Sequence, residues 1–73
     1  MEKILREALI IKYEGEIAEA KANITVYLKH PVGIGEHPDV VEEAGKQIET
    51  IEHARHCREI VSSFASAREP GGD

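Results

Sequence analysis

The sequence is poor in the features that mark most secreted, membrane-embedded or nucleic-acid-binding proteins. One cysteine among 73 residues, Cys57, excludes an internal disulfide. The longest apolar run near the start, Ala8 to Ile11, is far shorter than the roughly 20 residues of a membrane span, and no signal-peptide pattern precedes it. Basic residues are outnumbered 9 to 14, for a net charge of −5, so the positive surface that binds phosphate backbones or anionic lipid is missing. We therefore expect a soluble, cytoplasmic protein without nucleic-acid or membrane partners.

The segment HPVGIGEHP, residues 30–38, predicts the bend of a helical hairpin. Pro31 lacks an amide donor and restricts the residue before it, while Gly33 and Gly35 supply backbone freedom for a chain reversal. Good helix formers dominate on both sides. The expected fold is all-α: a hairpin over residues 1–65, with helices at about 2–29 and 39–65, the bend at 30–38, and a disordered tail at 66–73.

Apolar residues in both stretches recur at spacings of three and four, which is the coiled-coil pattern. In the first stretch they are Ile10, Tyr13, Ile17, Ala20, Ile24 and Tyr27, and in the second Val41, Ala44, Ile48, Ile51 and Ala54, followed by Val61 and Ala65. Folding about Ile34 places Tyr27 near Val41, Ile24 near Ala44, Ala20 near Ile48, and Ile17 near Ile51. In the two central pairs a large residue then faces an alanine, first on one helix and then on the other, as close-packed antiparallel helices require. Asp39 and Glu42 are expected to cap the second helix.

A second apolar stripe lies on the opposite side of the first stretch and needs a covering surface. With three residues of the second helix it gives the predicted interface: Ile4, Ala8, Ile11, Gly15, Ala18, Ala22, Cys57, Ile60 and Phe64. An apolar patch of this kind on a small chain predicts association, most simply a homodimer of hairpins forming a four-helix bundle. The alternative is that the hairpin ends splay and bury the stripe internally.

The residues Glu49, His53, His56 and Cys57 raise an alternative, a metal- or redox-responsive binding protein. Positions i and i+4 share a helix face, so Glu49, His53 and Cys57 could offer oxygen, nitrogen and sulfur to one zinc ion. No CxxC or HExxH spacing occurs, and the expected helix at residues 2–29 offers no clear fourth ligand. Cys57 is equally explained as a small packed residue. No catalytic constellation or cofactor motif is present, and an enzyme is not expected.

The stretch KANITVYLKHPVGIGEHPDVVEEAGKQIETI, residues 21–51, resembles small uncharacterised helical proteins of marine T4-like bacteriophages, the cyanophage type. The PVGIGEHP bend is the most specific part of this resemblance. It implies an accessory protein made inside the infected host cell, with no functional residue to carry over. The sequence thus predicts a non-enzymatic structural or protein-interaction module, acting as an adaptor or modulator of a host or phage protein.

Overall fold

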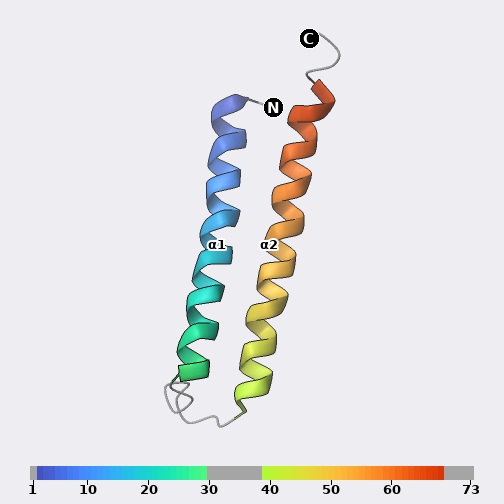
Figure 1. Ribbon diagram of the computed structural model, residues 1–73. Helices are drawn as coiled ribbons and strands as arrows, with labels where there is room; N and C mark the ends of the chain where they lie inside the picture. Colours follow the sequence, from blue (N-terminus) through green and yellow to red (C-terminus); the bar gives the residue numbers. More distant parts are fainter. Residues whose placement is uncertain (1, 30–38, 69–73) are drawn as a thin grey trace.

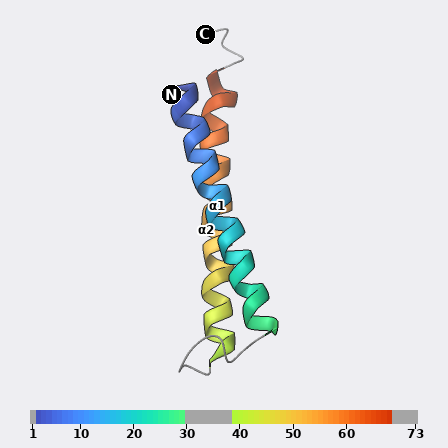
Figure 2. The same cartoon turned by 90° about the vertical axis from the view of Figure 1, so that its left-hand side faces the viewer.

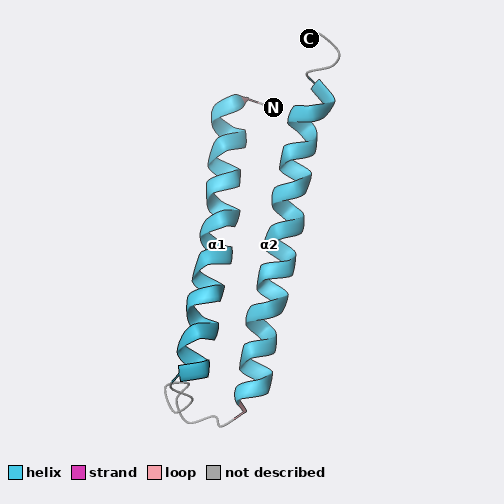
Figure 3. Ribbon diagram, in the orientation of Figure 1, coloured by secondary structure: helices cyan, strands magenta, loops and turns pink. Residues whose placement is uncertain are grey.

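A computed structural model describes residues 2–29 and 39–68, and in them the chain forms two helices and no strand. Helix α1 spans Lys3–Lys29 and helix α2 spans Val40–Arg68. They lie side by side and antiparallel, so the first turns of α1 are beside the last turns of α2 (Figures 1 and 3). The predicted all-α hairpin of two packed helices is confirmed.

The helix boundaries agree with the predicted ones to within a few residues. Helix α2 continues to Arg68, so residues 66–68, which the sequence pattern assigns to the tail, are helical. The predicted bend at 30–38 and the remainder of the predicted tail, residues 69–73, lie outside the described residues.

Helix α2 begins with the cap that the sequence predicts. The Asp39 side chain accepts a hydrogen bond from the backbone N–H of Glu42, with 2.9 Å between Oδ1 and N. The Asp39 carbonyl also accepts from the backbone N–H of Glu43, at 3.2 Å. The side-chain bond satisfies a donor that the first turn of a helix leaves unpaired, whereas the carbonyl bond is the first one within the helix. The acidic side chains of Glu42 and Glu43 interact favourably with the positive end of the helix dipole.

The seam between the helices is narrow. Among the residues whose side chains are described, four are buried: Ile17, Ala20, Ala54 and Val61, with Ala20 and Ala54 almost completely shielded from solvent. Every residue that the sequence places on the seam of α1 is buried or half-buried. The spacing of apolar residues in α1 therefore identifies its packed face correctly.

The predicted seam of α2 is wrong at two positions. Val41 is 83% exposed and Ile48 is 56% exposed. The residues that face α1 are instead spaced regularly by four and three, and all are buried or half-buried: Val40, Ala44, Gln47, Ile51, Ala54, Arg58 and Val61. Adjacent helix positions point about 100° apart, so Gln47 and Ile48 cannot both face the same neighbour. The polar Gln47 takes the packed position because it has a hydrogen-bonding partner on α1.

Two polar contacts join the helices and fix their relative register. Asn23 Nδ2 donates a hydrogen bond to Gln47 Oε1 at 3.2 Å, in a partly buried position. Nearer the open end, Arg58 Nη1 lies 3.4 Å from Glu14 Oε2. Among the residues that the structure describes, no buried side-chain nitrogen or oxygen lacks a hydrogen-bonding partner. The polar residues in the seam are therefore tolerated because they are paired.

Candidate functional site

The side of α1 that faces away from α2 is an uncharged apolar strip, which we call the outward face. Ile4 is 81% exposed and Ile11 is 69% exposed. The whole strip is exposed, and it consists of Ile4, Ala8, Ile11, Gly15, Ala18 and Ala22. Val26, 46% exposed, extends it toward the end of the helix. Figure 2 views the molecule from the side of α1, with α1 in front of α2, so this face is turned toward the reader. The structure thus leaves the predicted α1 stripe uncovered by the rest of the described chain.

The outward face is bordered by charged residues on both edges. Lys12 and Glu19, each one position after a residue of the strip, lie on one edge, and Glu14 and Lys21, each one position before a residue of the strip, lie on the other. All four side chains belong to exposed residues. The first edge therefore carries one acid and one base, seven positions apart, and the second carries two acids and one base, because the exposed Glu7 lies one heptad before Glu14.

On the first edge, Lys12 is held by contacts within α1. Its Nζ lies 2.5 Å from Glu16 Oε2 and 4.6 Å from the centre of the Tyr13 ring. The hydrogen bond to Glu16 is the main cause that raises the pKa of Lys12 above its ordinary 10.5, and the charges of Glu16, Tyr13 and Cys57 act in the same direction.

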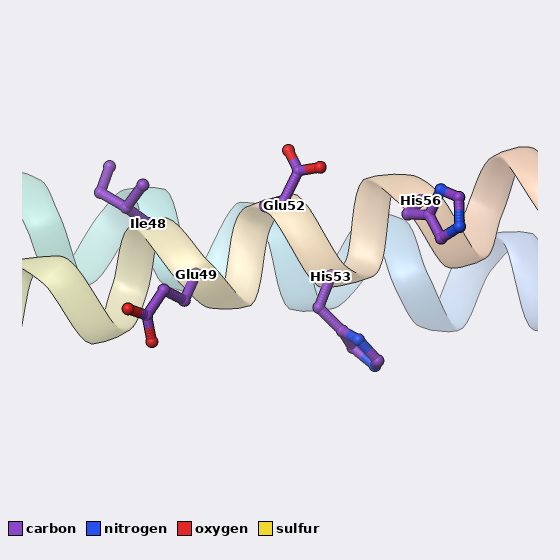
Figure 4. A pocket seen from close by; sticks show the side chains of 5 residues that line it. All are labelled: Ile48, Glu49, Glu52, His53 and His56. Atoms are coloured by element: carbon purple, nitrogen blue, oxygen red, sulfur yellow. The ribbon is translucent and has the colours of Figure 1, made fainter.

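The outward side of α2 has the opposite character. A shallow surface pocket lies there, lined by Ile48, Glu49, Glu52, His53 and His56. In Figure 4, Glu49 and His53 extend to one side of the helix while Ile48 and Glu52 extend to the other. All five residues are exposed. Because the two glutamates, Glu49 and Glu52, extend to opposite sides of the helix, the pocket does not present converging polar groups to a small molecule. It is also open to water.

The predicted interface residues on α2 are less exposed than those on α1. Cys57 is half-buried, whereas Ile60 and Phe64 are 44% and 48% exposed. They lie toward the open end of the hairpin. They add apolar surface there, but they are not part of the outward face of α1.

The structure brings together only two of the four residues considered for a metal or redox site. Cys57 Sγ lies 3.6 Å from His53 Nε2, one helical turn away. His56 instead has its Nδ1 4.0 Å from Glu59 Oε1. Within residues 2–29 and 39–68, no group of three or more histidine, cysteine or acidic residues is placed to hold a metal ion. The contact between His53 and Cys57 is explained by their i, i+4 spacing alone.

Gly15, at the centre of the outward face, has no packing role within the hairpin. A Cβ atom built on it would meet nothing within 4 Å, and the same holds for Gly45 on α2. Glycine in the interior of a helix costs about 1 kcal/mol relative to alanine. The hairpin by itself therefore gives no reason for a glycine at position 15.

The apolar strip was predicted from the sequence, but the charged edges beside it were not. Lys12, Glu14, Glu19 and Lys21 occupy the positions that flank an apolar heptad stripe. In coiled coils these flanking positions decide partner choice and orientation. Aligning the second stripe to a heptad would have identified them.

Comparison of the chain with protein-family models, with curated proteins and with solved structures finds no match in any of the three. Over the residues described, neither helix has a stretch apolar enough to cross a membrane. The case for function therefore depends on the surfaces of the two helices.

Proposed function

We propose that this protein is a non-enzymatic interaction module whose hairpin associates with a second copy into a four-helix assembly. The observation that carries the proposal is the contrast between the two outward surfaces. Ile4 and Ile11 expose most of their area on an uncharged strip of α1, while the corresponding side of α2 carries Glu49, Glu52 and His56. When a partner covers such an apolar strip on a small soluble chain, the strip is removed from water and the free energy of the system falls.

The resemblance of the PVGIGEHP bend to proteins of marine T4-like phages suggests the setting. In this setting the module is a phage accessory protein in the cytoplasm of the host cell, acting as an adaptor or modulator of a host or phage protein. Its two-helix architecture and shallow α2 surface are consistent with contacts between proteins rather than with chemistry on a small molecule.

Sedimentation equilibrium over a range of protein concentrations tests the self-association. The parent protein is expected to be dimeric at tens of micromolar, and Ile11→Asp is expected to be monomeric, because an isolated carboxylate in an apolar interface is unfavourable by several kcal/mol. Ile48→Asp is the matched control, since Ile48 is also more than half exposed but lies on α2. It should remain dimeric.

A strictly monomeric parent protein would refute the proposal. Equal masses for the Ile11→Asp and Ile48→Asp variants would show that the outward face of α1 is not the contact.

A further inference from the structure

The residues of the outward face follow a heptad spacing. From Ile4 to Ala22 the positions alternate by four and three residues, and the next two positions of that spacing are the polar Thr25 and Lys29. The stripe lies on the side of α1 opposite the seam that contains Ile17 and Ala20. Helix α1 thus has a face for one helix on each of two opposite sides, and among the described residues only α2 occupies one of them.

We propose that α1 of a second copy packs antiparallel on this face, in the register that sets Gly15 against Ala18 of the second copy. This inference rests on the proposed self-association and adds its orientation. The same register sets Ile11 against Ala22 of the second copy, so that a large side chain meets a small one. The two-fold axis passes between Gly15 and Ala18, where the smallest side chains allow the closest approach.

Charge complementarity selects this register. In an antiparallel pair, the flanking positions on each edge of one helix meet the same edge of the other. Lys12 then meets Glu19 of the second copy, and Glu14 meets Lys21 of the second copy. The two-fold axis repeats both contacts, so every charged residue at a flanking position beside the centre has a partner of opposite sign.

Other arrangements of the same stripe bring like charges together. A parallel pair would place Glu7 beside Lys12 of the second copy but Glu14 beside Glu19, so that a repulsive contact would offset an attractive one. It would also set Ile11 against Ile11 and Gly15 against Gly15. An antiparallel pair shifted by one heptad would place Lys12 beside Lys12 and Glu14 beside Glu14 at the axis. Like charges at such positions are unfavourable.

This arrangement explains the glycine at position 15. Within the hairpin a side chain at this position would contact nothing, but in the pair Gly15 lies beside the two-fold axis. Glycine and alanine at a helix contact let the two backbones approach closely, which increases the number of van der Waals contacts along the strip.

The pairing also defines the arrangement of the four helices. Because the outward face lies opposite the seam, the two α1 helices lie at the centre and the two α2 helices lie outside them. The assembly is then a layer rather than the closed four-helix bundle that the sequence analysis expects. Ile60 and Phe64 belong to α2 and lie outside the contact between the α1 helices.

Cysteine cross-linking tests the orientation directly. Two variants, Ile11→Cys and Ala22→Cys, are each made in a Cys57→Ser background, and each is oxidised alone and in an equal mixture. The antiparallel register brings position 11 of one copy to position 22 of the other, while two copies of position 11 are about 16 Å apart along the helix axis. The mixed disulfide is therefore expected to exceed either homodimer by about tenfold, because a disulfide needs Cα atoms within about 7 Å.

A charge reversal provides an independent readout that needs no covalent bond. Glu19→Lys would set two lysines against each other in the antiparallel pair, and its dissociation constant is expected to rise by about tenfold at low salt. The double variant Lys12→Glu with Glu19→Lys should restore the parent value. In a parallel pair, Glu19→Lys would instead remove the repulsion with Glu14 and strengthen the dimer.

The outcomes separate this inference from the proposed function. A dimeric parent that gives homodimeric disulfides, or that is strengthened by Glu19→Lys, overturns the antiparallel register while leaving self-association intact. A monomeric parent overturns both. Circular dichroism of each variant, and of Cys57→Ser alone, confirms that the hairpin is folded before cross-linking; positions 11, 12, 19 and 22 are exposed, and position 57 is half-buried.

Discussion

The seam register makes a strong prediction about two isoleucines, Ile17 and Ile48. Ile17 is only 8% exposed, whereas Ile48 is 56% exposed. Ile17→Ala removes three carbon atoms from a site that is almost fully out of water. At about 0.8 kcal/mol per buried methylene, the transfer cost is about 2 kcal/mol, and the cavity left behind raises the expected loss to about 2–4 kcal/mol.

This loss is large for a hairpin of this size. A single core in a chain below about 80 residues rarely supplies more than about 3–5 kcal/mol, so Ile17→Ala is expected to leave much of the protein unfolded. Ile48→Ala should change the free energy of unfolding by less than about 0.5 kcal/mol, since its side chain is mostly in water already.

Urea unfolding followed by circular dichroism at 222 nm, with all proteins at the same concentration, measures both effects. Equal losses for Ile17→Ala and Ile48→Ala, or a larger loss for Ile48→Ala, would refute the observed register and would restore the seam in which Ile48 faces Ala20.

Three further predictions concern the cap, an ion pair and the metal alternative. Asp39→Ala removes the acceptor for the first turn of α2 and should lower the free energy of unfolding by about 1 kcal/mol, while Asp39→Ser should retain most of it. The raised pKa of Lys12 means that its contribution to stability is fully present below pH 10.5, its ordinary pKa, and is lost as pH rises through the folded-state value. Melting temperature should therefore fall more between about pH 9.5 and 11.5 in the parent than in Lys12→Met, and identical pH profiles would exclude this pair. Protein purified without a histidine tag is expected to bind less than one zinc per chain and to melt at the same temperature with and without chelator. One tightly bound zinc per chain that is lost in His53→Gln or Cys57→Ser would instead support the metal-responsive alternative.

The architecture was predictable from sequence because it depends on local signals. Helix α1 contains only one residue that disfavours a helix strongly, Gly15, and its apolar spacing locates the seam without a partner being known. Asp39 could be assigned as a cap because its side chain needs only the backbone of the next turn, which every helix supplies. Such features require no knowledge of what lies across the seam.

The register of α2 was not predictable from apolar spacing, because the packed face includes polar residues. Val41 and Ile48 fit the hydrophobic pattern, yet Gln47 and Arg58 face α1. Gln47 is partly buried there and pairs with Asn23, and Arg58 contacts Glu14 at the margin of the seam. Both contacts are properties of the two helices together. A pattern of hydrophobicity along one helix carries no information about them.

The small seam also bears on why the outward face matters for stability. Two of the four buried residues are alanines, Ala20 and Ala54, which remove little apolar area from water when the hairpin forms. Much of the apolar surface of α1 is on the other side, at Ile4 and Ile11, where folding of one chain does not bury it. If a second copy covers that surface, dissociation and unfolding become one transition, and mass action makes the melting temperature rise with protein concentration. A melting temperature that is unchanged over a hundredfold range of concentration would mean that the narrow seam alone stabilises the hairpin.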